Sequence, residues 1–238
     1  MNSAPGFSMS NFAALNAELL RVAADLMLPA YCVSCSRSGG LLCLGCASAC
    51  RAAPRRAHPA HPPPGFPTCI AASAYAGVLR SVLLAYKEHN RRRLLCVLAP
   101  MLAIGLSAAL QNLPANERVL LVPVPSSRAA RRHRGGDHLR PLVAAALRHV
   151  HVRQPVGVSS MLRAVPGARD SLGLSAVARR SNIRGRFVPR RGLPLTDGVS
   201  VLVVDDVVTS GATLAEAAGT LRGLGCHVVG AVALAAVS

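Results

Sequence analysis

The run Val201–Thr213 constrains the fold of this chain more than any other feature. It reads Val-Leu-Val-Val-Asp-Asp-Val-Val-Thr-Ser-Gly-Ala-Thr. Four apolar residues, Val201–Val204, are typical of a buried strand that leads to the carboxyl edge of a parallel sheet, where open α/β folds bind ligands. The turn that follows leads into a predicted helix, Ala212–Leu224, whose N-terminus attracts phosphate. The run therefore predicts a strand, a ligand site and a helix in that order.

Two acids and a hydroxyl-rich loop follow the predicted strand. Asp205 and Asp206 come directly after it, and the loop consists of Thr209, Ser210, Gly211, Ala212 and Thr213. Gly211 lets the backbone approach a ligand closely, and the hydroxyls add donors for a phosphate. Acids beside a phosphate site repel the ligand unless they bind sugar hydroxyls or a cation. We therefore predict a phosphorylated-sugar site, rather than acids that only cap the helix. We expect both acids to be exposed and to add little to stability.

Strands and helices alternate through the rest of the chain. The further predicted strands are Cys69–Tyr75, Val119–Val124, Val156–Leu162 and His227–Ala235, and the further helices are Val78–Glu88, Leu94–Gln111 and Leu139–Val150. Such alternation predicts an α/β fold with a parallel twisted sheet flanked by helices. Leu94–Leu110 carries no charge, but it is short for a membrane span and contains Pro100, so a buried helix is the better interpretation.

Changes in composition define the predicted domains. Residues 1–28 hold a tail and a helix beginning after Asn11, residues 29–68 a cysteine cluster with a Pro-rich linker, and residues 69–238 the α/β domain. Within these domains we predict three loops: Arg51–Pro67, the basic Ser126–Gly136, and the mobile Arg163–Arg191 with a helical piece near Ala176–Ser181. No stretch has the pattern of a secretory leader, so we expect a cytoplasmic protein without membrane insertion.

Four cysteines have the spacing of a zinc site. Cys32 and Cys35 form one Cys-x-x-Cys pair, and Cys43 and Cys46 form a second after a gap of seven residues. Two such turns can hold one tetrahedral zinc ion. In the reducing compartment expected here, clustered cysteines indicate a metal before a disulfide. We therefore predict a structural Zn²⁺, with a redox pair or incidental buried thiols as alternatives and Cys50 as a less favoured fourth ligand.

The chain is strongly basic, with 27 basic and 10 acidic residues and a formal net charge of +17. All basic residues except Lys87 are arginines, and they are concentrated between Arg128 and Arg191. Such a stretch suits a polyanion, either single-stranded DNA or pyrophosphate. A general arginine bias that decorates solvated surfaces explains the excess equally well. Because aromatic residues make up only 3% of the chain, nucleic-acid binding would be electrostatic rather than based on base stacking.

An arginine follows the predicted strand Val119–Val124. Arg128 would lie just beyond this buried strand, near Asp205 and Asp206 on a neighbouring one. A guanidinium in that position would suit a pyrophosphate leaving group, because it can form bidentate hydrogen bonds with phosphate oxygens.

Several motifs together resemble a known family. In chain order they are the Cys-x-x-Cys pairs, Tyr75–Arg80 leading to Lys87, Val-Pro-Val-Pro with Arg128, Arg134–His138, Leu174–Asn182 and Val201–Thr213. From about Leu26 onward the chain is similar to the ComF family of phosphoribosyltransferase-like competence proteins. Its last motif resembles the ligand-binding motif of type I phosphoribosyltransferases. Two departures occur: Arg134–His138 reads Arg-Gly-Gly-Asp-His where members usually have Arg-Gly-Phe-Asn-Gln, and a usual Gln near Ser171 is missing.

The resemblance implies a type I phosphoribosyltransferase fold with a small N-terminal zinc-knuckle module. It also implies a site for phosphoribosyl pyrophosphate and Mg²⁺, in which Asp205 and Asp206 hold the ribose hydroxyls and the loop from Thr209 to Thr213 holds the 5-phosphate. Arg128 and Lys87 would contact the pyrophosphate. Thr209 stands where purine-salvage members often have an Asp, which argues against purine salvage and leaves the acceptor open.

Three functions are open at this point. The first is an enzyme that transfers phosphoribosyl to an unidentified acceptor. The second is a non-catalytic DNA-uptake or DNA-processing factor that uses the pocket as a sensor or as a grip on nucleic acid. The third is a regulator whose partner binds the zinc module. The resemblance implies a role in competence and DNA uptake, with DNA-uptake proteins as partners.

Overall fold

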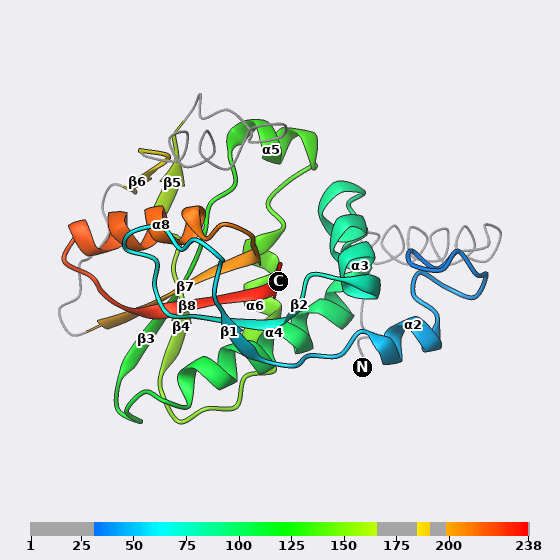
Figure 1. Cartoon of the computed structure of the whole chain (residues 1–238), viewed down its shortest axis with the longest axis horizontal. Coiled ribbons are helices and arrows are strands. Elements are labelled where there is room, and N and C mark those ends of the chain that lie inside the picture. The colour runs from blue at the N-terminus through cyan, green and yellow to red at the C-terminus, as the bar shows by residue number, and fades with distance from the viewer. Residues whose placement is uncertain (1–30, 166–184, 191–198, 238) are drawn as a thin grey trace, which may run out of the picture.

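The computed structural model describes residues 31–165, 185–190 and 199–237. Six strands form one sheet in the order β1-β2-β8-β7-β3-β4 (Figure 1). Their bounds are β1 Arg55–Ala57, β2 Cys69–Ala74, β3 Arg118–Pro123, β4 Val156–Val158, β7 Val199–Val208 and β8 His227–Ala236. Neighbouring strands are parallel except β1 and β2, which are antiparallel. A separate antiparallel pair joins β5 (Leu162–Ala164) to β6 (Phe187–Pro189).

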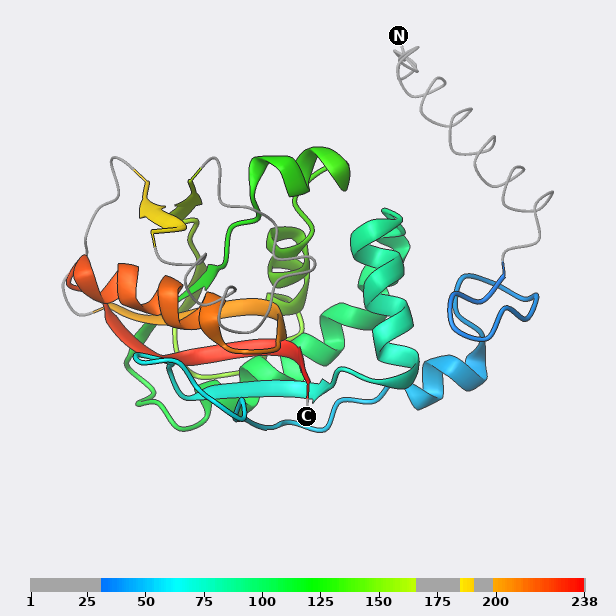
Figure 2. The ribbon, with the colours of Figure 1, turned by 45° about the horizontal axis from the view of Figure 1, so that its top comes forward.

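Helices cover both faces of the large sheet. On one face α8 (Ala212–Gly223) packs on β7 and β8, whereas α4 (Leu95–Leu110) and α6 (Leu139–Leu147) lie on the other (Figures 1 and 2). The other described helices are α2 (Leu44–Ala49), α3 (Gly77–Glu88), η1 (Arg92–Leu94) and α5 (Arg128–His133). Burial on both faces explains the continuous apolar runs of the parallel strands. The predicted α/β fold, with a parallel sheet flanked by helices, is confirmed.

Small side chains bring α4 close to the sheet. A Cβ atom on Gly105 would lie 3.0 Å from the Cβ of Ala72 in β2, so a larger residue would push the helix away. The window Arg92–Leu110 has a mean hydropathy of 2.0 and is, within the described residues, the one helical stretch long and apolar enough to cross a membrane. Half of this window is buried inside the protein, and α4 also packs on α6. This packing is that of a core helix.

Two predicted loops contain regular structure. Arg55–Ala57, inside the predicted linker, forms β1 and pairs with β2 at the edge of the sheet. Arg128–His133, inside the predicted basic loop, forms α5, which begins where the Ser127 hydroxyl accepts a hydrogen bond from the backbone N–H of Ala130 at 3.0 Å. Both elements are very short, so their intrinsic propensity is weak and tertiary contacts decide whether they form.

Two predicted strands have different bounds. β7 continues to Val208, beyond the predicted end at Val204, because its pairing with β8 extends to Val208 and Ala236. The predicted strand Val156–Leu162 is divided between β4 in the large sheet and β5 in the small one. The helix predicted from Asn11 and the helical piece near Ala176–Ser181 lie outside the described residues.

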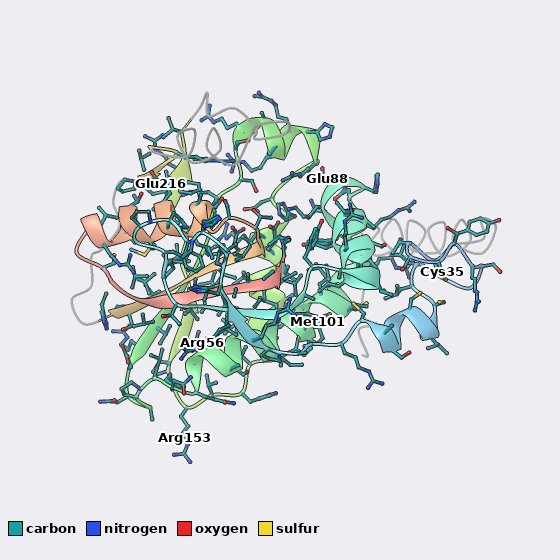
Figure 3. The ribbon with its side chains drawn as sticks, in the orientation of Figure 1. Cys35, Arg56, Glu88, Met101, Arg153 and Glu216 are labelled. Carbon is teal, nitrogen blue, oxygen red and sulfur yellow. The ribbon has the colours of Figure 1, made fainter. Side chains whose placement is uncertain are left out.

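The cysteine-rich segment forms a small unit beside α3. It contains an isolated bridge between Tyr31 and Ser38, followed by α2. The unit lies on the side of α3 that faces away from the sheet (Figures 1 and 2). Cys50, at the end of α2, connects it to the core through a contact of 3.4 Å between its Sγ and the Sδ of Met101 in α4, which is labelled in Figure 3 together with Cys35.

Candidate ligand-binding site and metal centre

A cavity of about 180 Å³ opens at the carboxyl end of β7, and we call it the acid cavity. Its polar lining includes the acids Asp205 and Asp206, the loop residue Thr213 and the basic residues Lys87, Arg134, His138 and Arg186. These side chains come from α3, from the turn before α6, from the residue preceding β6, and from β7 with α8. The fold therefore brings distant parts of the chain together at the edge where open α/β sheets bind ligands.

Asp206 is held by two basic partners. Its Oδ2 lies 2.6 Å from Lys87 Nζ and 2.6 Å from His138 Nε2, and the residue is 7% exposed. Burial alone would raise the pKa of Asp206, but Lys87 and His138 hold it well below the usual range of a carboxyl. Burial opposes the charge on Lys87, yet Asp206 raises the pKa of this lysine. The expectation of an exposed acid is therefore wrong for Asp206, because α3 brings a lysine onto it.

Asp205 has the opposite electrostatic environment. Its side chain is partly exposed, and its Oδ1 accepts a hydrogen bond from the backbone N–H of Asp206 at 2.8 Å. Desolvation and the adjacent Asp206 carboxylate raise the pKa of Asp205 to about 7. A ligand that donates hydroxyl hydrogens or brings a cation would favour the charged form of Asp205. This acid is therefore available to a ligand, whereas Asp206 already has two partners.

His138 is a site residue that the sequence marked only as a departure from the family pattern. The residue is 8% exposed, and its Nδ1 atom is buried with no partner among the described residues. Its carbonyl oxygen accepts a hydrogen bond of 2.6 Å from the Tyr86 hydroxyl in α3. Asp137, another of the three changed residues in this motif, accepts a hydrogen bond from the Leu139 backbone N–H at 3.1 Å and so caps α6. Asp137 and His138 thus fix the start of α6 and connect it to Asp206.

The predicted phosphate loop lies between β7 and α8. Gly211 is the N-cap of α8 and has φ 73°, in the left-handed region that glycine adopts without strain. α8 begins four residues after the end of β7, so its N-terminus lies at the carboxyl end of this strand, where it would stabilise an anion. Thr213 lines the acid cavity, whereas Thr209, Ser210, Gly211 and Ala212 form the turn and are not part of that lining.

A second pocket, of about 460 Å³, adjoins the acid cavity, and we call it the arginine pocket. Pro125 and Ser126 line both. The arginine pocket is lined by four arginines from three parts of the chain, Arg128, Arg131, Arg163 and Arg190, and no acid from the described residues lines it. Arg128 therefore lies next to the acid cavity rather than in its lining.

Arg186 is the second site residue that sequence reasoning missed. It is one of many arginines in the stretch from Arg128 to Arg191, and only the fold distinguishes it, by bringing it into the lining of the acid cavity. Its Nε is buried and has no hydrogen-bond partner among the described residues. Arg134, by contrast, forms an ion pair of 3.0 Å with Glu88, which Figure 3 labels at the end of α3.

The four predicted zinc ligands lie together. The Sγ atoms of Cys32, Cys35, Cys43 and Cys46 are all within 4.8 Å of one another, and those of Cys35 and Cys43 are 3.6 Å apart. A tetrahedral ion with Zn–S bonds of about 2.3 Å would separate its sulfurs by roughly 3.8 Å, so the cluster fits zinc. Cys50 contacts Met101 instead and is outside the cluster. The four-cysteine arrangement of a zinc knuckle is confirmed.

The pKa values of two clustered cysteines are shifted in opposite directions. Burial would raise the pKa of Cys32, but backbone hydrogen bonds, with Cys43 foremost, lower it to about 6. Burial and hydrogen bonds with the neighbouring cysteines raise the pKa of Cys46 to about 12. A divalent cation bound by the four sulfurs would favour the ionised form of each.

Comparisons with known proteins agree with this architecture. The family described as "Phosphoribosyl transferase domain" matches residues 150–238, which include β7 and α8. The chain is 28% identical over 225 residues to the "DNA utilization protein YhgH" of Salmonella typhi, a match that covers 86% of this chain and 96% of the relative. It is also 43% identical over 51 residues to the "Orotate phosphoribosyltransferase" of Parvibaculum lavamentivorans, covering 21% of this chain and 26% of that protein. The ordered motifs, the fold and these matches together support a ComF-like protein of the phosphoribosyltransferase type.

Proposed function

We propose that this protein binds phosphoribosyl pyrophosphate in the acid cavity and transfers the phosphoribosyl group to an acceptor. The observation that carries the proposal is the single cavity in which Asp205 and Asp206 meet the beginning of α8. Ribose hydroxyls can donate hydrogen bonds to the acids, while the 5-phosphate accepts from the backbone N–H groups of α8. A ligand with only one of these two parts would use half of the site.

The proposed reaction is a substitution at C1′ of the ribose. The acceptor supplies the electron pair of the new bond, the C1′–O bond to pyrophosphate breaks, and pyrophosphate leaves with the bonding electrons. Positive charge develops on the ribose and negative charge on the leaving group, so cations near the leaving oxygens lower the barrier. We assign this role to Arg186, whose Nε has no partner among the described residues, and to Arg128, whose pocket adjoins the cavity.

Lys87 and His138 have a supporting role in this proposal. Both contact Oδ2 of Asp206 and keep this carboxyl ionised and fixed in place. The Lys87 ammonium has donors beyond the one directed at Asp206 and can also bind a pyrophosphate oxygen. Mg²⁺ takes oxygen ligands, so the Asp205 carboxylate and pyrophosphate oxygens would hold it, and it would neutralise charge on the leaving group.

Calorimetry with phosphoribosyl pyrophosphate and Mg²⁺ tests the proposal. We expect saturable binding that Asp205→Asn weakens by about 1.5–3 kcal/mol, the usual effect of losing a hydrogen bond to a charged group. Glu117→Gln is the matched control, because it also removes one carboxylate, from the residue just before β3 at the opposite end of the strands. Pyrophosphate release, measured against a panel of bases and amines, would then identify the acceptor. Equal affinities for the wild type and Asp205→Asn would contradict the site assignment.

A second function is supported by the arginine pocket. Four arginines around about 460 Å³, with no acid from the described residues in the lining, suit phosphates of single-stranded DNA as well as a pyrophosphate. The relative named as a DNA utilization protein favours the same interpretation. Under this alternative the protein is a non-catalytic DNA-uptake or DNA-processing factor, with DNA-uptake proteins as partners. It would bind phosphoribosyl pyrophosphate as a sensor but would release no pyrophosphate with any acceptor.

A further inference from the structure

The Pro-rich segment 58–67 lies against the phosphate loop. It leaves β1, passes over α8 and returns to β2, as the cyan loop near α8 shows in Figure 1. Pro59 and Pro67 are buried, and Phe66 is partly buried against the hydrophobic core. The predicted linker or surface loop is therefore partly packed on the protein, although most of its residues are exposed. We call residues 58–67 the clamp.

The clamp touches the phosphate loop at Gly211. A Cβ atom built on Gly211 would lie 2.6 Å from Cε2 and 2.7 Å from Cδ2 of Phe66, and 3.1 Å from Cγ of Pro59. Side chains do not approach this closely, so the Phe66 ring occupies the space where any other residue at 211 would place its side chain. Glycine is therefore required at this position by a contact within the protein as well as by its φ of 73°.

Hydrogen bonds hold the clamp in this position. Arg222 in α8 donates from Nη1 to the carbonyl oxygen of Gly65 at 2.9 Å, next to Phe66. On the other side, the backbone N–H of Ala231 in β8 donates to the carbonyl oxygen of Thr68 at 2.8 Å. The prolines further reduce the number of conformations open to the segment. Phe66 is thus fixed relative to both α8 and β8.

We propose that Phe66 is a positioning residue for the phosphate loop. Phe66 is not part of the lining of the acid cavity, so it acts through Gly211. By packing on the N-cap of α8, it holds the turn in the conformation in which the first N–H groups of the helix face the cavity. The identity of the ligand rests on the function proposed above, whereas the contact between Phe66 and Gly211 does not.

Comparing the affinities for two ligands distinguishes a positioning role of Phe66 from a general loss of structure in its variants. Phosphoribosyl pyrophosphate carries a 5-phosphate, whereas inorganic pyrophosphate does not need the phosphate loop. We expect Phe66→Ala to weaken the affinity for phosphoribosyl pyrophosphate at least 10-fold and the affinity for inorganic pyrophosphate less than 2-fold. Phe66→Leu should retain affinity within about 3-fold, because it fills much of the same space. Pro64→Ala, at an exposed position of the same segment, is the control and should bind as the wild type does. Equal weakening of both ligands by Phe66→Ala would overturn the proposal.

A double-mutant cycle tests the contact without any ligand. Gly211→Ala should lower Tm markedly, because its Cβ meets the Phe66 ring. In the Phe66→Ala background the same substitution should lower Tm by less than half as much, leaving mainly the cost of the positive φ. Strictly additive Tm losses would show that Phe66 does not act on Gly211. Because this measurement needs no ligand, it can support the contact between Phe66 and Gly211 even if the proposed function is wrong. It can also contradict that contact while the proposed function remains correct.

Discussion

Asp205 and Asp206 are neighbours in the chain, but their carboxylates have different partners. Lys87 and His138 stabilise the charge of Asp206, whereas Asp205 is held beside a like charge. A buried carboxylate that keeps a lysine paired is costly to remove, because the lysine is then left without its partner. A carboxylate that is repelled by its neighbour destabilises the ligand-free protein and becomes favourable only when ligand binds. Asp206 therefore stabilises the structure, and Asp205 is available to bind the ligand.

Opposite changes in stability follow for the two acids. Asp206→Asn should destabilise the ligand-free protein by about 3 kcal/mol at both pH 5 and pH 8, since it leaves Lys87 unpaired. Asp205→Asn should raise Tm at pH 8 by about 2–4 °C, corresponding to roughly 1 kcal/mol, because it removes a like charge. Thermal unfolding without ligand measures both. A lower Tm for Asp205→Asn at pH 8 would refute the assignment of the repelled charge to this residue.

The pH dependence has a definite sign for each acid. The pKa of Asp205 in the folded protein is about 7, above the value of about 3.9 in the unfolded chain. Folded Asp205 therefore retains a proton between these pH values, and its destabilising charge appears as the pH rises through this window. The increase in Tm caused by Asp205→Asn should accordingly be smaller at pH 5 than at pH 8. The pKa of Asp206 is depressed, so its contribution is present above its unfolded value and is lost only in acid.

At the scale of elements, the cysteine unit has little regular structure of its own. Apart from α2, which has six residues, and the bridge between Tyr31 and Ser38, residues 31–50 have no regular structure. Few segments of this size are stable without a disulfide or a metal. We therefore propose that one Zn²⁺ per chain holds the turn with Cys32 and Cys35 to the turn with Cys43.

Removing single cysteines tests this assignment. Cys46→Ser should abolish most of the bound zinc in protein purified without chelators, because it removes one of the four clustered sulfurs. Cys50→Ala should keep about one zinc per chain, since its sulfur contacts Met101 rather than the cluster. Elemental analysis measures both variants. If Cys46→Ser retained zinc and Cys50→Ala lost it, the fourth zinc ligand would be Cys50 rather than Cys46.

At the scale of the whole molecule, the net charge of +17 is unevenly placed. The arginine pocket lies between α5 and the β5–β6 pair, next to the acid cavity. Other arginines are elsewhere: Arg148 and Arg153 are exposed between α6 and β4. Figure 3 shows Arg153 pointing away from the molecule on the side opposite α5. The comparison of these two groups separates a specific pocket from general attraction between opposite charges.

The salt dependence of single-stranded DNA binding can be measured for variants of each group of arginines. We expect measurable binding. A plot of the logarithm of the association constant against the logarithm of salt concentration should have a slope of about −0.7 per phosphate contacted. Arg163→Gln with Arg190→Gln should reduce that slope by about 1.4, for two lost contacts. Arg148→Gln with Arg153→Gln removes the same charge and should leave the slope nearly unchanged. Equal flattening by both pairs would mean that DNA is attracted only by the overall charge.

The sequence by itself determined the elements whose pattern is local. The run from Val201 to Thr213 predicts a strand, two acids and a turn into a helix, and the structure contains β7 and α8 in that order. The two Cys-x-x-Cys pairs likewise predict a cluster that the structure contains. Both patterns could be interpreted from sequence because the chemistry and the spacing lie within a few residues of one another.

The tertiary structure alone decided which side chains meet at the site. Lys87 and His138 are far from Asp206 in the sequence, and their common contact with one carboxyl oxygen depends on how α3 and α6 pack. The same holds for Arg186, whose place in the lining of the acid cavity no local pattern in the sequence marks. Phe66 contacts Gly211 because a Pro-rich segment without a periodic apolar pattern packs beside the start of α8. Long-range contacts such as these leave no periodic pattern in the sequence, so only the packed chain defines them.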